Sequence, residues 1–195
     1  MALGGFFGCL GILAVVVIIV AVFVIMLYNR LVGLKNRAES SWADIDVQLK
    51  RRYDLIPNLV ETVKGYAGHE RETFENVTKA RQQAIEVTGD VAKMAQAENF
   101  LTQTLRSLFA LAEAYPELKA NQNFLDLQAQ LAEIEEVLSQ ARRYYNAVVR
   151  DLNTAVEKVP TNIVAMLFGF KKREYFEIED AAAREAPKVD FSRKE

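Results

Sequence analysis

The feature that most constrains this chain is its start, residues 1–29, where no charged residue occurs. Between residues 10 and 28 the sequence is almost entirely apolar. A helix of about 20 such residues crosses a hydrocarbon core of roughly 30 Å, and in lipid the backbone must satisfy its own hydrogen bonds. The run therefore predicts one transmembrane helix.

Three other interpretations of the run fit less well. A cleaved signal peptide needs a basic start and a short apolar core, whereas this segment has no Lys or Arg before a long core. Cys9 after Gly8 is a weak sign of lipid attachment, but it precedes the apolar run instead of following it. A core helix of a soluble protein would need apolar partners that the rest of the chain does not supply.

The charges around the run predict its orientation. Arg30, Lys35 and Arg37 follow the run, and no basic residue precedes it. The positive-inside rule then places the body in the cytoplasm and the short N-terminus outside, as a single-pass protein of the cell membrane.

The composition of the chain limits which binding and catalytic sites it can form. The formal net charge is −2, so there is no general basic field for nucleic acid. One cysteine and one histidine exclude an internal disulfide, a thiolate cluster and a multi-histidine metal site within one chain. No nucleotide-binding loop and no nucleophile–base pair is recognisable, and we read His69 as a residue at a helix start. We therefore expect no enzymatic activity and no cofactor.

Apolar residues recur at steps of three and four along the body, which is the pattern of buried helix faces. The pattern predicts helices over residues 31–64, 70–88, 91–115 and 117–159, the first continuous with the membrane helix. Pro57 should bend the first helix near Tyr53, and Asp90 is suited to cap the third. The predicted core positions are Leu31, Leu34, Ala38, Trp42, Ile45, Leu49, Tyr53, Ile56, Leu59, Val63, Phe74, Val77, Ala84, Ile85, Met94, Leu101, Leu105, Leu108, Ala112, Tyr115, Phe124, Leu127, Leu131, Ile134, Leu138, Ala141, Tyr145, Val148, Leu152, Ala155 and Val159.

We expect an all-α protein, in which the transmembrane helix continues into an antiparallel up-down four-helix bundle with long, coiled-coil-like helices. The predicted domains are an anchor over residues 1–29, a bundle over 30–170 and a charged tail over 171–195, mobile in part, with Phe191 as a docking residue. The fourth helix should return toward the bilayer. The apolar residues 162–170 follow this helix, and two interpretations of them stay open. They contact lipid headgroups, or they cover the open end of the bundle. The membrane-contact candidates are Leu167, Phe168, Phe170, Lys171, Lys172 and Arg173.

Two further groups of residues are candidates for binding. A cluster of polar side chains on the first helix is consistent with a partner-binding face, although helix-stabilising pairs such as Asp46 with Lys50 are the default reading. Its members are Asp46, Gln48, Arg51, Arg52 and Asn58. In the anchor, Gly4, Gly8 and Gly11 share one helix face, and small residues at such spacing let membrane helices approach closely. They favour self-association.

The chain also contains several long motifs that occur together in one known family. IDVQLKRRYDLIPNLV at residues 45–60 follows Trp42, and YPELKAN at 115–121 and ARRYYN at 141–146 come later. Together they resemble the LemA family of bacterial membrane proteins, over essentially the whole chain. The chain departs from the family pattern at 151–153, where a second Tyr-Asn pair is usual, and at 159–160, where Phe-Pro is usual. These departures put only the end of the fourth helix in doubt.

The resemblance implies one N-terminal span, a helical domain, and partners among TPM-domain membrane proteins or membrane metalloproteases. From the residues we predict a non-enzymatic, membrane-anchored scaffold that self-associates or organises partners at the cytoplasmic face. The alternative is a monomeric regulatory adaptor or sensor component for a membrane protease or a signalling partner. The lipid bilayer is an expected partner, and nucleic acid is not.

Overall fold

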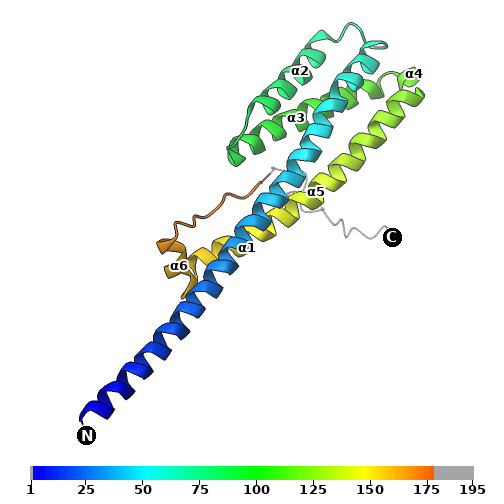
Figure 1. The fold of residues 1–195 in the computed structure, drawn as a ribbon. Helices are drawn as coiled ribbons and strands as arrows, with labels where there is room; N and C mark the ends of the chain where they lie inside the picture. The colour runs from blue at the N-terminus through cyan, green and yellow to red at the C-terminus, as the bar shows by residue number, and fades with distance from the viewer. Residues whose placement is uncertain (1, 178–195) are drawn as a thin grey trace, which may run out of the picture. The chain divides into compact units, whose positions relative to one another are not determined.

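The structure is a computed structural model that describes residues 2–177, with side chains described from residue 11 onward. Within these residues every regular element is an α-helix (Figure 1). This confirms the all-helical prediction. The helices are α1 (Ala2–Lys64), α2 (Arg71–Glu86), α3 (Val91–Glu113), α4 (Pro116–Lys119), α5 (Gln122–Glu157) and α6 (Thr161–Leu167).

The first helix, α1, confirms the predicted continuity between the apolar run and the body. It extends over 63 residues from Ala2 to Lys64 and includes Pro57. Its only interior glycine after the apolar run is Gly33, and one glycine costs a helix only about 1 kcal/mol. The bend expected at Tyr53 stays a prediction. The apolar segment and the residues that follow it therefore belong to one helix, with no loop between them.

The chain divides into two compact units, and α1 and α5 each contribute to both. Among the described residues, the first unit comprises residues 2–55 and Asp126–Tyr175, and the second comprises Ile56–Leu125 with Phe176 and Glu177. This division differs from the predicted boundaries at residues 29/30 and 170/171, which stay a prediction, as does the up-down arrangement of four helices.

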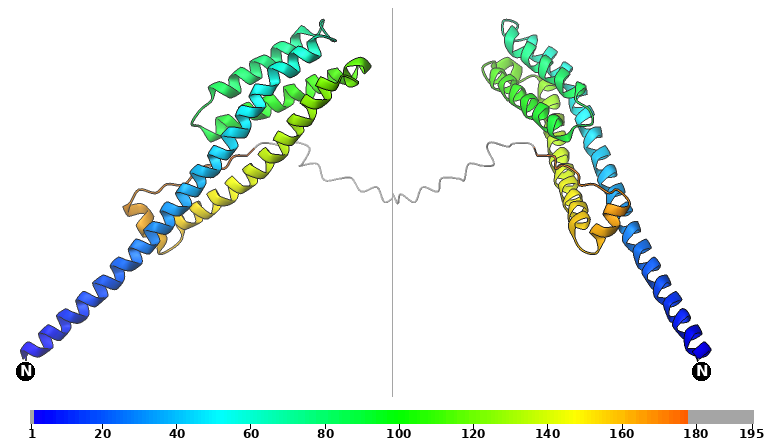
Figure 2. Two further views of the ribbon diagram at one scale, coloured as in Figure 1. Left: turned by 45° about the vertical axis from the view of Figure 1, so that its right-hand side comes forward. Right: turned by 90° about the vertical axis from the view of Figure 1, so that its left-hand side faces the viewer.

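In the first unit α1 and α5 pack antiparallel along their length (Figure 2). Leu31 shares an apolar cluster with Ala155, the Trp42 and Tyr145 rings lie 5.2 Å apart, and Arg52 pairs with Glu135. Residue numbers rise on α1 as they fall on α5, which defines the antiparallel direction. The buried apolar residues of this unit include Leu31, Ala38, Ile45, Leu49, Tyr53, Leu131, Ile134, Leu138, Tyr145, Val148, Leu152 and Ala155, all predicted core positions.

The second unit contains a hairpin of α2 and α3, which contact each other. Asp90 caps α3, because its Oδ1 accepts a hydrogen bond from the Lys93 amide at 3.0 Å, as predicted. Hydrogen bonds from this amide and from the Lys93 side chain lower the pKa of Asp90. The unit's core includes Ile56, Leu59, Val63, Phe74, Val77, Ala80, Ala84, Met94, Leu101, Leu105, Leu108, Ala112, Leu118 and Phe124. The prediction was wrong for Ile85, which is 39% exposed near the end of α2.

The predicted helix over residues 117–159 is interrupted. The short α4 ends at Lys119, and α5 begins at Gln122. Asn121 starts α5 by accepting a hydrogen bond from the Phe124 amide at its Oδ1 (3.1 Å), while its Nδ2 donates to the Tyr66 hydroxyl at 2.9 Å. An asparagine at this position competes with the backbone for hydrogen bonds, which explains the break. At the other end α5 stops at Glu157, so Val159, predicted to be core, is 69% exposed.

Residues 171–177, the first part of the predicted tail, are extended and held in place. Asn153 makes a pair of hydrogen bonds with the Arg173 backbone, its Oδ1 accepting from the amide and its Nδ2 donating to the carbonyl, both at 2.9 Å. The Tyr145 hydroxyl donates to the Glu174 carbonyl at 3.0 Å. Phe191 and the rest of the tail lie outside the described residues.

Candidate functional site

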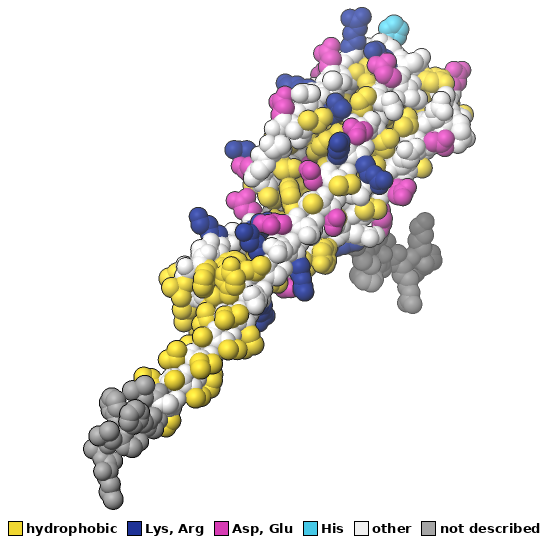
Figure 3. Space-filling view, viewed as in Figure 1, with side chains coloured by type: hydrophobic (Ala, Val, Ile, Leu, Met, Phe, Trp, Pro, Cys, Tyr) yellow, Lys and Arg dark blue, Asp and Glu magenta, His cyan; other side chains and the backbone are white. Residues whose placement is uncertain are grey.

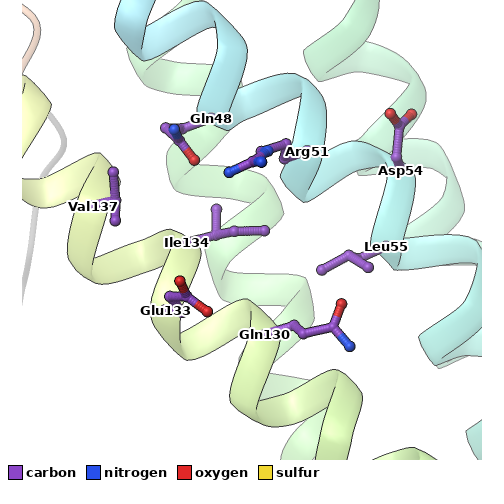
Figure 4. A pocket seen from close by; sticks show the side chains of 8 residues that line it. All are labelled: Gln48, Arg51, Asp54, Leu55, Gln130, Glu133, Ile134 and Val137. Carbon is purple, nitrogen blue, oxygen red and sulfur yellow. The ribbon is translucent and has the colours of Figure 1, made fainter.

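An open groove of about 410 Å³ lies between α1 and α5 in the first unit (Figure 4). In Figure 4 the side chains of Arg51 and Leu55 extend from α1 toward α5, whereas Asp54 points away from α5. The floor is apolar and includes Ile134, which is almost fully buried. The residues that line the groove are Gln48, Arg51, Asp54, Leu55, Gln130, Glu133, Ile134 and Val137.

The two walls of the groove are fixed by contacts directly beside it. The Arg52 guanidinium, only 2% exposed, lies 2.8 Å from Glu135 Oε1, and the carboxylate side of this pair is 42% exposed. Further along the helices the Trp42 ring packs against Tyr145. These contacts hold α1 against α5 beside the groove.

Burial raises the pKa of the Tyr145 hydroxyl, with the Glu174 carboxylate adding to the effect and Arg173 opposing it.

The structure distributes the predicted partner-face residues unevenly. Gln48 and Arg51 line the groove, whereas Arg52 is buried beside it and has no exposed surface to offer a partner. Asp46 is exposed on α1 outside the groove lining, and Asn58 is exposed in the second unit. The polar cluster on α1 is thus not one continuous face.

The groove lining also includes charged residues that are not among the predicted partner-face residues. Asp54 lies at the rim of the groove on α1, with its side chain turned away from α5, and Glu133 belongs to the lining on α5. Arg51, Asp54 and Glu133 are exposed, and within residues 2–177 the structure gives none of them a charged partner. The spacing of apolar residues on α1 and α5 does not identify Glu133 as a groove residue, because Glu133 lines the groove only through the packing of α1 beside α5.

A second feature lies at the end of the apolar segment, where α6 packs on α1 (Figure 2). Val164 and Ala165 of α6 are buried in a cluster with Leu31. The Tyr28 ring lies 4.8 Å from the Phe168 ring and 5.8 Å from the Phe170 ring, between centroids. We call Tyr28, α6, Phe168 and Phe170 the aromatic collar. It brings residues 161–170 to the point where the apolar run ends.

The predicted membrane-contact residues differ in what surrounds them. Leu167 is 74% and Phe168 56% exposed, which is unusual for large apolar side chains, whereas Phe170 is partly buried. Lys171 is exposed, and Lys172 forms an ion pair with Glu157. Arg173 is paired with Glu39 at 2.6 Å and is held by Asn153 through its backbone. Two of the three cations are therefore neutralised by nearby carboxylates.

Before Val24, the apolar part of α1 whose side chains are described is not covered by the rest of the described chain. Its large side chains between Ile12 and Met26 are mostly half or more exposed, and the segment is long and apolar enough to cross a membrane. Gly11 has open space around its Cβ position. Gly4 and Gly8 lie in α1, but their surroundings are outside the described side chains.

The described residues contain no group of three or more His, Cys, Asp or Glu side chains placed to hold a metal ion. His69 lies in the turn before Glu70, the residue that precedes the first turn of α2. This agrees with its reading as a residue at a helix start.

An uncovered apolar segment that continues without a break into a helical body is typical of an all-helical protein with a candidate N-terminal membrane helix. The chain belongs to the LemA family, whose sequence profile matches residues 41–191. The resemblance seen in the sequence is thereby confirmed.

Comparison with curated proteins gives relatives under two names. Magnetosome proteins MamQ 1 and MamQ 2 of Paramagnetospirillum magneticum are each 24% identical over 182 residues, covering 80% of this chain and 67% of the relative. Protein LemA of Metamycoplasma hominis is 23% identical over 167 residues, covering 86% of this chain and 74% of the relative. The chain thus spans about two thirds of the MamQ proteins.

Proposed function

We propose that this chain is a non-enzymatic, membrane-anchored scaffold that holds a segment of a partner protein in the groove between α1 and α5. The observation that carries the proposal is the charge arrangement of the groove. Arg51, Asp54 and Glu133 surround an apolar floor without charged partners among the described residues, although Arg52 and Glu135 next to them are paired. Exposed charges around an apolar strip resemble the polar rim and apolar centre of protein interfaces.

The chemistry of the groove specifies the kind of segment that fits. Leu55, Ile134 and Val137 accept an apolar side chain. Asp54 and Glu133 attract a cation, and Arg51 attracts a carboxylate. The occupant is therefore a polypeptide segment with an apolar anchor between a basic and an acidic residue. Candidates for its source, which the family resemblance implies, are TPM-domain proteins and membrane metalloproteases.

Copies of the chain have fewer routes to association than the coiled-coil-like pattern of residues 117–159 predicts. The apolar seam of α5 is buried within one chain at Leu131, Leu138, Tyr145 and Leu152. Self-association through this seam would require the chain to open. The apolar segment of α1, with Gly11 on its surface, is the remaining route. If the chain stays monomeric, the same groove serves a regulatory adaptor.

The membrane arrangement is part of the proposal. Arg30, Lys35 and Arg37 follow the apolar segment and favour a cytoplasmic body. In that arrangement the aromatic collar lies at headgroup level, where aromatic rings are favoured. The exposed Leu167 and Phe168 then contact lipid. The opposite orientation would place the same groups at the outer surface.

Site-specific photocrosslinking in native membranes tests the groove. A photoreactive side chain at Val137 should give a discrete protein adduct, and Arg51→Glu should abolish it. The same side chain at Ala132, exposed on the other side of α5 by helix geometry, should give no such adduct. Mapping of the crosslinked peptide should place a basic residue beside an apolar one. An equal adduct at both positions, or one that survives Arg51→Glu, contradicts the proposal.

The mass of the wild-type protein in detergent decides between scaffold and adaptor. A multimer that Gly11→Leu converts to the mass of one chain supports self-association through α1. The mass of one chain for the wild type supports the adaptor.

Brominated lipids test the collar. A Trp42→Phe, Phe168→Trp protein carries one tryptophan at position 168, since the chain has only one Trp. Bromine near the headgroups should quench its fluorescence strongly. A matched Trp42→Phe, Tyr144→Trp protein has its tryptophan at an exposed position on α5 and should be quenched little. Equal quenching of the two proteins contradicts lipid contact by the collar.

A further inference from the structure

A second hollow in the first unit, of about 560 Å³, lies beside α1 directly after the apolar segment. It is formed by one face of α1, the last turns of α5 and the start of α6. We call it the basic pocket. Its lining consists of Asn29, Arg30, Gly33, Leu34, Arg37, Asp151, Thr154, Ala155, Lys158 and Thr161.

The charge of the basic pocket is not neutralised. Arg30, Arg37 and Lys158 line it, and within the described part of the chain no carboxylate forms an ion pair with any of them. Asp151 is the one carboxylate in the lining, and its Oδ1 lies 3.8 Å from the Arg150 Nε. An excess of positive charge therefore remains in the pocket.

A neighbouring hollow on the same unit provides a contrast. It contains Lys35, Lys172 and Arg173 in a comparable volume of about 540 Å³. There Glu39 neutralises Arg173 and lies 4.0 Å from Lys35, and Glu157 pairs with Lys172. Glu39 and Glu157 therefore neutralise much of the basic run at residues 171–173, which is the basic cluster most apparent in the sequence. Neither carboxylate lines the basic pocket.

The donors of the basic pocket suit a phosphate group. Two arginines and one lysine line it, and guanidinium forks match phosphate oxygens with two parallel hydrogen bonds. The Asn29 amide supplies a further donor from the same lining. Gly33 leaves the α1 surface open at this point, because nothing lies within 4 Å of its Cβ position.

The position of the pocket indicates where such a phosphate comes from. Arg30 follows Tyr28, the last residue of the apolar run, by two residues, which is about 3 Å along a helix. Arg37 lies roughly 10 Å further. In Figure 3 basic side chains gather just beyond the apolar stretch of α1. Membrane phosphates lie in the thin layer that borders the hydrocarbon core.

We propose that the basic pocket binds the headgroup phosphate of an anionic phospholipid, held by Arg30 and Arg37 of α1 and Lys158 at the end of α5. The bound lipid fixes the depth and rotation of α1 at the membrane surface. This proposal needs the membrane anchor but not the partner groove, so either can fail without the other.

Lipid binding to the full-length protein tests the proposal. In mild detergent, native mass spectrometry compares phosphatidylglycerol with phosphatidylcholine. The wild-type protein should favour phosphatidylglycerol, and Arg30→Gln, Arg37→Gln, Lys158→Gln together should weaken its binding at least about tenfold. The matched control, Lys35→Gln, Lys171→Gln, Lys172→Gln, removes the same charge nearby and should weaken binding less than about threefold. Equal weakening by both triple variants overturns the proposal.

Two further measurements keep the result clear. Asp151→Asn removes the one carboxylate of the lining and should strengthen phosphatidylglycerol binding, an outcome that misfolding cannot imitate. Inorganic phosphate at constant ionic strength should displace little lipid. If it binds the wild-type protein in neutral detergent as tightly as phosphatidylglycerol does, the natural ligand is a soluble phosphate and the lipid assignment is wrong.

Discussion

Arg52 of α1 and Glu135 of α5 form an ion pair of 2.8 Å in which the cation is almost completely buried and the anion is 42% exposed. A buried guanidinium loses its hydration and needs a charged acceptor to offset that loss. The pair therefore fixes the register of α1 against α5 beside the groove. An apolar pair of similar volume would stabilise the helices equally well but would not define which residues face each other.

Glu135→Ala should lower the free energy of unfolding by about 1–3 kcal/mol, because it leaves a buried cation without this acceptor while the exposed half of the carboxylate limits the loss. Thermal unfolding in mild detergent, followed by circular dichroism, measures the change. In a double-mutant cycle with Arg52→Met, the coupling between the two positions should be about 1 kcal/mol or more. Additive effects would show that the two groups do not interact.

Tyr145→Phe should cost about 0.5–1.5 kcal/mol at neutral pH, since it removes the hydrogen bond to the Glu174 carbonyl and keeps the ring against Trp42. The pKa of Tyr145 is raised above 10.0 by burial, so the unfolded chain releases this proton first as pH rises. The stabilisation is complete below pH 10.0 and falls above it. Melting curves from pH 8 to about pH 11 should decline more steeply for wild type than for the variant.

Asp90→Ala should lower the melting temperature at pH 7, because α3 loses its N-cap acceptor. The pKa of Asp90 lies below 3.8 in the folded protein, so its ionised form contributes stability above that pH. This contribution is lost as pH falls through the folded pKa. The difference between wild type and variant should therefore shrink in acid. Asp90→Asn keeps an acceptor and should retain most of the stability without this pH dependence.

Asn153→Ala should release residues 171–175 from α5, because both hydrogen bonds to the Arg173 backbone disappear. Two such bonds are worth roughly 2 kcal/mol together, so trypsin cleavage at 171–173 should accelerate roughly tenfold or more. Asn153→Asp keeps the acceptor for the Arg173 amide and should give an intermediate rate. Cleavage at the wild-type rate in the alanine variant would show that other contacts hold this segment.

The helix pattern predicted most of the fold. The stripes at steps of three and four located the buried positions of α1, α3 and α5, because a helix presents every third or fourth residue to the same side. They failed at the ends of helices, which periodicity does not locate. Asn121 interrupts the predicted long helix, and the end of α5 at Glu157 leaves Val159 exposed.

The candidate sites were less predictable than the fold. Arg51 and Arg52 are adjacent in sequence and equal in charge, yet one is exposed at the groove and the other is buried. The basic run 171–173 is the most visible cluster after α6, but Glu157 and Glu39 neutralise two of its members. Three cations that have no such partner, Arg30, Arg37 and Lys158, lie together in one lining although they come from two distant parts of the chain.

The sequence by itself determined the candidate membrane helix, the helical class, the buried faces and the family, because each depends on local periodicity, apolar length or an extended motif. Only the tertiary structure decided which charges are neutralised, where a groove opens and which residues join the end of the apolar segment. The physical reason is that a charge or an exposed ring is defined by its neighbours in space. Here those neighbours, as with Tyr28 and Phe168, are often more than a hundred residues away.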